Sequence, residues 1–281
     1  MKELKNKIVV ITGAGSGMGR AYALAFAKRG CRLALCDYDA KGLNETVDMA
    51  GKLSGSPVCH SAFDVSDKRS VEGFANKVKE ELGNAHIVIN NAGIEGSGQP
   101  IWATEEDSFR RVMEVNYYGV VYGTQAFLPQ LLSQKEAAVV NVSSIFGLIG
   151  TPNHADYCAS KFAVRGFTES LMTELNDSSV QVHLVHPGGI DTNIARQEHS
   201  QSFSQHYLKT SADDMVERVI HGITKNQSRI VYGNGSKKTE LGARLLPLTW
   251  MKKFTWHEMK KVIDLTHYDF RTLNENTRLR K

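Results

Sequence analysis

The 281-residue sequence has little cysteine, only six prolines and no long hydrophobic run. Its four cysteines form no CxxC pair and no zinc-ligand spacing, so neither a disulfide framework nor a metal site is predicted. No apolar stretch approaches the roughly 18 residues that cross a bilayer, and no signal-peptide core follows Met1. We therefore expect a cytoplasmic protein whose thiols are reduced.

Neither basic nor acidic residues are in large excess. The net charge is +4, from 34 basic and 30 acidic residues, which is too small a surplus to indicate a nucleic-acid-binding face. The surplus is unevenly placed, because residues 237–281 carry +6 and residues 1–236 carry −2. With 41% hydrophobic residues, the chain can bury a core without disulfides or metals.

What is present is an alternation of β-branched segments with longer helical ones. Strands separated by helices form βαβ units, which build a mostly parallel α/β sheet covered by helices on both faces. Ligands bind such sheets at the carboxyl ends of the strands. Strands are expected at 8–11, 32–36, 58–63, 87–89, 138–142, 180–185 and 229–232, and helices at 20–29, 40–52, 71–82, 106–130 and 157–174.

A glycine-rich turn links the first strand to the first helix. Gly13, Gly17 and Gly19 allow the backbone to approach a pyrophosphate, which the helix N-terminus attracts. Asp37 follows the second strand, where a carboxylate can accept the ribose hydroxyls of NAD and repel the 2′-phosphate of NADP. Alternatively, Asp37 only caps the next helix. No Gly-Lys-Ser/Thr follows the turn, which excludes a P-loop.

Four polar residues form a candidate catalytic set. Tyr157 and Lys161 are four apart on one helix, so they share a face, and the lysine cation is expected to lower the pKa of the tyrosine toward neutrality. Ser144 follows the fifth strand and can orient a substrate oxygen. Asn116 lies inside the long helix, which it is expected to interrupt, placing water beside Lys161.

Together these motifs resemble those of the short-chain dehydrogenase/reductase family. The resemblance rests on the turn at 12–19, Asp64-Val65, the Asn-Asn-Ala-Gly of 90–93, the catalytic four and Pro187-Gly188, and it extends from residue 6 to about 235. It implies a Rossmann-type, doubly wound domain with a seven-stranded sheet, usually a homodimer or homotetramer. The cofactor contacts that it implies are Gly13, Ser16, Gly17, Met18, Gly19, Asp37, Asp64, Val65, Asn91, Ala92, Gly93, Tyr157, Lys161, Pro187, Gly188, Ile190 and Thr192.

The resemblance, together with these residues, predicts an NAD-dependent oxidoreductase that interconverts a hydrophobic secondary alcohol and its ketone. Tyr157 would be the general acid or base, and Asn116, Ser144 and Lys161 would assist it. An NADP-dependent carbonyl reductase and a non-catalytic NAD-binding regulator are the alternatives. A substrate pocket is expected around Ile94, Ile145, Phe146, Leu148, Ile149, His154 and Gly189.

Two stretches stand outside the motifs. Residues 196–211 are polar and aperiodic, which predicts a loop or mobile lid within a substrate segment spanning about 190–211. Residues 237–281 form a basic extension to the catalytic domain of residues 1–236, and Pro247 should interrupt any long helix in it. We expect this extension to pack on its own domain or on a partner subunit. Contact with a membrane surface and a disordered tail are less favoured alternatives.

Overall fold

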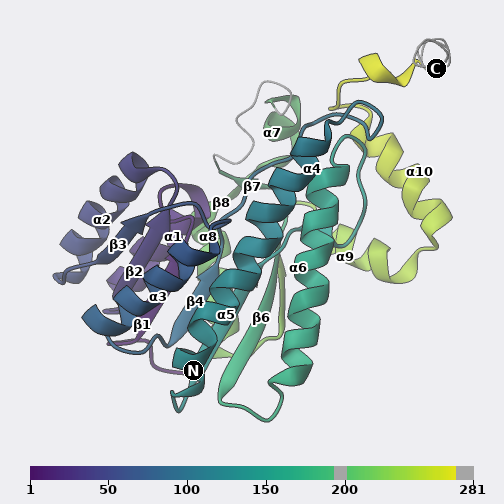
Figure 1. Cartoon of the computed structure of the whole chain (residues 1–281). Helices are drawn as coiled ribbons and strands as arrows, with labels where there is room; N and C mark the ends of the chain where they lie inside the picture. Colours follow the sequence, from purple (N-terminus) through teal and green to yellow (C-terminus); the bar gives the residue numbers. More distant parts are fainter. Residues whose placement is uncertain (193–200, 270–281) are drawn as a thin grey trace.

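The computed structural model describes residues 1–192 and 201–269, and its centre is one parallel sheet (Figure 1). All neighbouring strands run parallel, as crossover helices require, so the expected seven-stranded Rossmann-type sheet is confirmed. The strands follow the spatial order β3 (Cys59–Ala62), β2 (Arg32–Asp37), β1 (Ile8–Thr12), β4 (Ile87–Asn90), β5 (Ala137–Val142), β6 (Val180–Pro187) and β9 (Arg229–Tyr232).

Two separate hydrophobic cores lie on the two faces of the sheet. Because side chains alternate along a strand, Val9 and Ile11 of β1 enter one core, and Ile8 and Val10 enter the other. The first core is closed by α1 (Gly17–Lys28), α2 (Ala40–Ser54) and α8 (Ala212–Thr224), the last of which the sequence reading had not identified. The second core is closed by α3 (Lys68–Glu81), α5 (Gly119–Leu132) and α6 (Ala155–Glu174).

The expected helix over 106–130 has an interruption at Asn116. It consists of α4 (Glu106–Met113), a π-helical turn η1 (Glu114–Tyr118) and then α5. The wider turn gives Asn116 a place where its side chain leaves the helix and contacts a neighbouring loop. Such π-helical turns within α-helices are frequent at functional sites.

The segment after β6 is more regular than the sequence suggested. The expectation of a loop at 196–211 is wrong for residues 201–207, which form α7 (Gln201–Tyr207). A short parallel pair, β7 (Ile190–Asp191) with β8 (Thr210–Ser211), joins the two ends of this segment. Residues 193–200, which belong to the expected mobile segment, lie outside the described residues.

The basic extension forms two helices beyond β9, α9 (Ser236–Leu245) and α10 (Leu248–Met259), with Pro247 between them. Met251, Thr255 and Met259 are spaced one helical turn apart and are buried, and Met259 packs with Phe146 and Cys158 of the domain. Figure 1 shows both helices beyond α6, at the end of the molecule opposite α2 and β3. Two short 3₁₀ turns complete the described elements, η2 (Ile145–Gly147) and η5 (Thr266–Tyr268).

No helix within residues 1–192 and 201–269 is both long and apolar enough to cross a bilayer.

Candidate active site

A cavity of about 950 Å³ opens at the carboxyl ends of β1, β4, β5 and β6. This is the edge of a parallel sheet where open α/β folds bind ligands. Every residue for which we predicted a cofactor contact lies on its wall, and so do three of the four predicted catalytic residues, Ser144, Tyr157 and Lys161. The cavity has two parts, a glycine-rich cradle near α1 and a chamber lined by apolar side chains.

In the cradle, backbone segments pack directly against one another without side chains between them. A Cβ atom added to Gly19 would stand 1.7 Å from the carbonyl oxygen of Gly13, so only glycine fits there. Gly13 itself has a left-handed φ of +67°, and a Cβ on it would stand 2.8 Å from the Cα of Ala92. Because α1 begins at Gly17, its unpaired N–H groups and the positive end of its dipole face this space. These residues fit the pyrophosphate of a dinucleotide.

Side-chain hydrogen bonds join the turn to the end of β4. The Thr12 hydroxyl accepts the backbone N–H groups of Asn91 and Ala92, both at 3.0 Å. The Asn91 amide in turn donates to the Thr12 carbonyl at 3.0 Å. The segment after β4 is therefore held against the glycine turn, which fixes the middle of the cradle.

Asp37 lies at the end of β2 and faces the cradle. One carboxylate oxygen accepts the Gly15 N–H at 2.7 Å, and the other accepts the Asp39 N–H at 2.8 Å. The cap of α2 is Asp39, whose side chain accepts the Lys41 N–H. The alternative that Asp37 serves only as that helix cap is therefore wrong, because Asp37 holds the glycine turn and keeps lone pairs toward the cavity.

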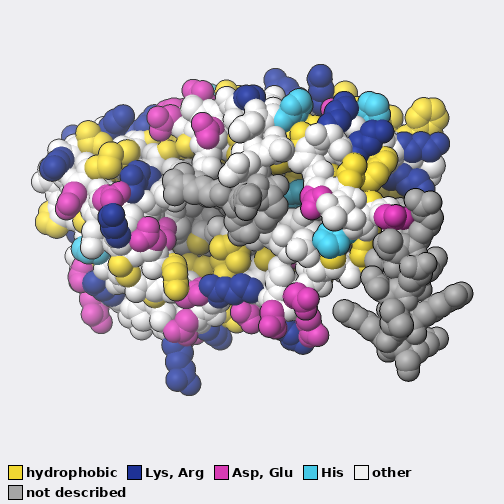
Figure 2. Space-filling model, turned by 90° about the horizontal axis from the view of Figure 1, so that it is seen from above, with side chains coloured by type: hydrophobic (Ala, Val, Ile, Leu, Met, Phe, Trp, Pro, Cys, Tyr) yellow, Lys and Arg dark blue, Asp and Glu magenta, His cyan; other side chains and the backbone are white. Residues whose placement is uncertain are grey.

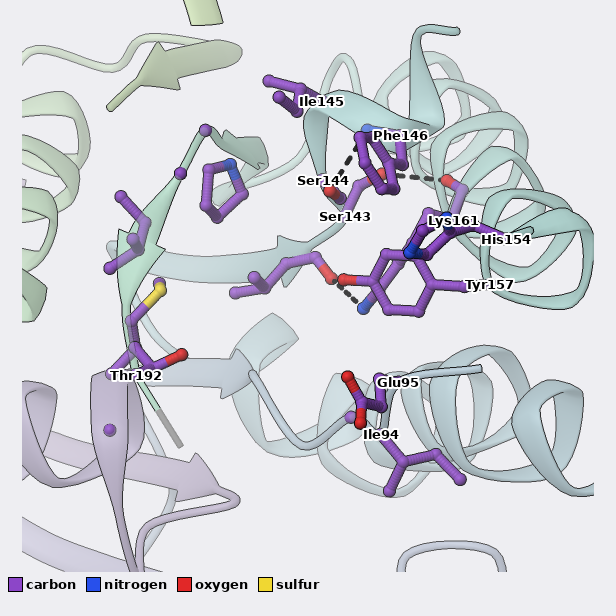
Figure 3. A pocket seen from close by; sticks show the side chains of 18 of the residues that line it. Ile94, Glu95, Ser143, Ser144, Ile145, Phe146, His154, Tyr157, Lys161 and Thr192 are labelled. Atoms are coloured by element: carbon purple, nitrogen blue, oxygen red, sulfur yellow. Dashed lines mark hydrogen bonds between the residues drawn. The ribbon is translucent and has the colours of Figure 1, made fainter. Parts of the chain in front are cut away.

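The proposed proton-transfer residues converge on one wall of the chamber. Figure 3 shows Ser144, Tyr157 and Lys161 on one side of the cavity, with Glu95 and Ile94 below Tyr157 and Thr192 on the opposite side. The Lys161 ammonium lies 5.5 Å from the centre of the Tyr157 ring and donates to the Val142 carbonyl at 3.2 Å. Tyr157 and Lys161 thus share a face of α6, as their spacing predicted.

The pKa values of this pair depart from the sequence-based expectation. Burial raises the pKa of Tyr157 to about 12, although a hydrogen bond with the Ser144 hydroxyl acts in the opposite direction. Burial also lowers the pKa of Lys161 to about 8, because its charged form loses solvation. The pKa of Tyr157 thus lies above its usual value and not below it as expected, because the loss of solvation outweighs the hydrogen bond with Ser144.

Asn116 lies behind the wall and not on it. It is fully buried, its carbonyl oxygen accepts the Ile94 N–H at 2.8 Å, and its amide donates to the Ile94 carbonyl at 2.9 Å. The amide also donates to the Ser160 hydroxyl on α6 at 3.1 Å. Both amide hydrogens are thus bound to protein groups. Asn116 ties the loop after β4 to the catalytic helix and acts as a positioning residue.

The chamber draws its walls from segments far apart in the sequence. Ile94, Ile145, Phe146, Ile149, His154 and Gly189 line it as expected, whereas Leu148 is buried outside it. The segment that was expected to cover the cleft does contribute, through α7, but its individual lining residues were not named. The lining by the basic extension was not predicted, although the one-turn spacing of Met251, Thr255 and Met259 on α10 was a signal for a packed helix. The lining residues that were not named from the sequence include Glu95, Thr151, Phe203, Tyr207, Leu208, Asn234, Lys238, Thr239, Phe254, Thr255, Glu258 and Met259.

The histidines of β6 and the cysteine beside Tyr157 have structural environments. His183 and His186 are buried, and their Nδ1 atoms lie 2.8 and 2.7 Å from the carbonyl oxygens of Gln227 and Ser144. Cys158 is buried next to Thr151, and burial raises its pKa, which disfavours the reactive thiolate. Across the part of the chain that the structure describes, no cluster of three or more potential metal ligands occurs.

Relatives of the chain cover most of its length. A family model described as short chain dehydrogenase matches residues 7–202. The Mycobacterium tuberculosis protein SadH is 38% identical over 264 residues, which is 90% of this chain and 95% of SadH. Rat estradiol 17-beta-dehydrogenase 11 is 33% identical over 82% of this chain and 76% of its own length. Human epidermal retinol dehydrogenase 2 is 40% identical over 62% of this chain and 56% of its own length.

Solved structures show the same architecture. A short chain dehydrogenase/reductase from Burkholderia phymatum in complex with NAD has a TM-score of 0.76 at 33% identity, over 82% of this chain and 90% of that chain. An alcohol dehydrogenase from Thermococcus sibiricus complexed with 5-hydroxy-NADP has a TM-score of 0.70 at 27% identity, over 80% of this chain and 94% of that chain. With its dinucleotide cradle and its Ser144–Tyr157–Lys161 wall, this chain belongs to the short-chain dehydrogenase family of NAD(P)-dependent oxidoreductases.

Proposed function

We propose that this protein is an NAD-dependent oxidoreductase that interconverts a hydrophobic secondary alcohol and its ketone. One observation carries the proposal. The hydroxyls of Ser144 and Tyr157 lie together on the wall where an apolar chamber meets a cradle that fits a dinucleotide. A carbonyl or carbinol oxygen in the chamber can reach both hydroxyls, and the apolar walls accommodate the rest of the substrate.

Each residue of the wall has a distinct part in the proposed reaction. When bound, the nicotinamide supplies or takes up a hydride. Tyr157 removes the hydroxyl proton of the alcohol during oxidation and returns a proton to the carbonyl oxygen during reduction. The Ser144 hydroxyl donates to the same oxygen and stabilises the charge that develops on it. Lys161 places a cation near the phenol, which favours its ionised form in the transition state.

NAD is the proposed cofactor because of the charge at the end of β2. A carboxylate at Asp37 accepts hydrogen bonds from ribose hydroxyls and repels a 2′-phosphate. Tyr38, the next residue, supplies no cation that could bind such a phosphate. Among the solved structures, the one from Burkholderia phymatum is a complex with NAD.

The proposed substrate class follows from the lining of the chamber. Ile145, Phe146, Phe203, Phe254 and Met259 line the same cavity as the two hydroxyls and contribute apolar surface to it. Burial of apolar substrate surface on such walls stabilises binding by about 25 cal/mol per Å². The names of two relatives, estradiol 17-beta-dehydrogenase 11 and epidermal retinol dehydrogenase 2, support a hydrophobic alcohol.

The test is cofactor reduction with a graded panel of secondary alcohols. We expect NAD to be reduced, with kcat/KM rising from short aliphatic alcohols to large alicyclic and aromatic ones. Parallel assays with NADP are expected to be slower at equal cofactor concentration. No reduction of either cofactor by any alcohol would overturn the proposal. A preference for the shortest alcohols would overturn its substrate class.

A further inference from the structure

The basic extension has an exposed apolar surface where α9 meets α10. Of the sixteen large hydrophobic side chains that are exposed among the described residues, six lie within positions 241–254. Leu245, Leu248 and Trp250 are 70%, 83% and 69% exposed, values that leave most of each side chain in water. We name this surface the α9–α10 corner; its apolar residues are Leu241, Leu245, Leu246, Leu248, Trp250 and Phe254.

The apolar residues of the corner lie on the outward faces of their helices. Leu241 and Leu245 are four residues apart on α9, and Trp250 and Phe254 are four apart on α10, so each pair occupies one face. The adjoining flank of α10 carries Met251 and Met259, which are buried, and Met259 packs with Phe146 and Cys158 of the domain. The buried flank of α10 thus anchors the extension, and Leu248 and Trp250 remain exposed beside it.

Lysines surround this apolar surface, and the nearby acids are already paired. Glu240 pairs with Arg244 at 3.1 Å, and Glu258 pairs with Lys261 at 3.0 Å. The four lysines that lie within α9 and α10 are exposed and have no ion pair with any described residue: Lys237, Lys238, Lys252 and Lys253. Figure 2 shows dark-blue basic side chains beside yellow hydrophobic ones at the end of the molecule that carries these helices.

We propose that the α9–α10 corner docks on the surface of a membrane that contains anionic lipid. Leucine and tryptophan side chains enter the interface between headgroups and acyl chains, where the amphipathic indole ring is favoured. The surrounding lysines bind the negative surface potential of the lipid headgroups. The protein would lie on the bilayer without crossing it.

Charge favours a lipid surface over a second copy of the chain. In a symmetric contact, the same patch of two subunits meets itself, so lysines of one copy would stand against lysines of the other. Like charges brought together in this way oppose association. An anionic lipid surface would attract the same lysines through its negative charge and would bury the same leucines and Trp250.

The corner also adjoins the substrate chamber. Phe254 is 56% exposed on the corner and at the same time lines the cavity, as do Lys238 and Thr239 of α9. A hydrophobic alcohol dissolved in the bilayer would therefore enter the chamber directly from the docked surface. This supply route rests on the proposed function, whereas docking itself does not.

The test is sedimentation of the full-length protein with vesicles of phosphatidylcholine, with or without phosphatidylserine. We expect binding to the vesicles that contain phosphatidylserine and release by added salt. The double variant Leu248→Ser/Trp250→Ser removes apolar contacts and should lower the partition coefficient by about tenfold or more. Lys252→Glu/Lys253→Glu reverses two charges and should lower it by a similar factor.

Matched variants on α2 and α3 serve as controls, because they make the same chemical change on another surface. Leu53→Ser and Lys52→Glu/Lys79→Glu alter exposed side chains and should leave vesicle binding unchanged. Thermal unfolding midpoints equal to that of the parent protein would show that each variant is folded. Turnover of a water-soluble alcohol is recorded separately, so that a failed reaction and failed docking are distinguished.

Three outcomes would overturn the proposal. The first is that the parent protein binds neither kind of vesicle. The second is that the corner variants bind as tightly as the controls do. The third is concentration-dependent self-association that Leu248→Ser/Trp250→Ser abolishes without any vesicle binding, which would identify a second copy of the chain as the occupant of the corner.

Discussion

The two parts of the cavity are built in different ways. In the cradle, the geometry is set by the backbone: Gly19 packs on the Gly13 carbonyl, and Thr12 and Asn91 fix the adjoining segment. In the chamber, the geometry is set by side chains such as Phe203 and Met259, from segments far apart in the chain. The cradle thus presents a uniform surface to a common cofactor, while the chamber can change with the substrate.

The strongest test of this division concerns the wall where the two parts meet. Tyr157→Phe removes only the phenolic hydroxyl, and we expect kcat to fall about 10³-fold, since positioned acid–base groups contribute about 10²–10⁴-fold. Binding of NAD, measured by calorimetry, should weaken far less. Tyr122→Phe on α5 is a matched control that should retain full turnover. Undiminished kcat in Tyr157→Phe would refute the role of this residue.

The next test acts on the cradle alone. Asp37→Ser removes a carboxylate that is proposed to bind the ribose, and we expect NAD affinity to fall by about tenfold to a hundredfold. Affinity for NADP should rise, because the repulsion of its 2′-phosphate is lost. Asp48→Ser, an exposed site on α2, serves as the control. Equal NAD binding by Asp37→Ser and the parent protein would contradict the assignment of NAD specificity to this residue.

A third variant acts on the chamber alone. Phe254→Ala removes half-buried apolar surface at the cavity rim, and we expect KM for a large hydrophobic alcohol to rise about tenfold. NAD affinity should not change, because Phe254 belongs to the chamber and not to the cradle. A parallel loss of NAD affinity would show that the two parts of the cavity are coupled. Leu132→Ala on α5 is the matched exposed control.

The smallest effect is one of stability and depends on pH. The buried Lys161 has a pKa lowered to about 8, so its protonation in the folded state has a cost below that pH. Relative to the usual value of 10.5, this cost is on the order of 3 kcal/mol. Lys161→Met removes this cost of protonation. The variant also leaves the Val142 carbonyl without its hydrogen-bond donor, and this loss cancels about 2 kcal/mol of the gain in stability.

We therefore expect Lys161→Met to be about 1 kcal/mol more stable than the parent protein below pH 8. The unfolded chain binds more protons than the folded one between pH 8 and 10.5, so the stability of the parent protein rises over this range. The advantage of the variant should accordingly shrink there. Urea unfolding across this range measures the effect, with exposed Lys79→Met as control. Lower stability of the variant at pH 7 would contradict the cost assigned to the buried charge.

The same division explains what could be predicted from the sequence. The sheet and the cradle depend on local patterns, namely β-branched strands and glycines at fixed spacing, and both were found where expected. The chamber depends on side chains that tertiary packing brings together, so local patterns did not show that Phe203 and Met259 line the same cavity. The pKa of Tyr157 was misjudged because sequence spacing reveals the neighbouring charge but not the depth of burial.

The π-helical turn at Asn116 could be predicted only in part. An asparagine inside a helical pattern suggested an interruption, and the structure has one at η1. Its consequence, the two hydrogen bonds to the Ile94 backbone, depends on a loop more than twenty residues earlier in the chain. Sequence reading could thus locate the interruption but not its partner.

One measurement tests the proposed reaction most directly. The protein is incubated with NAD and a large secondary alcohol that carries deuterium on its carbinol carbon, and the nicotinamide is analysed by NMR after a single turnover. The proposal predicts that deuterium moves to the nicotinamide and that one equivalent of ketone forms. A protein that binds NAD in its cradle yet transfers no deuterium from any alcohol of the panel would be a cofactor-binding regulator, and the proposed reaction would be wrong.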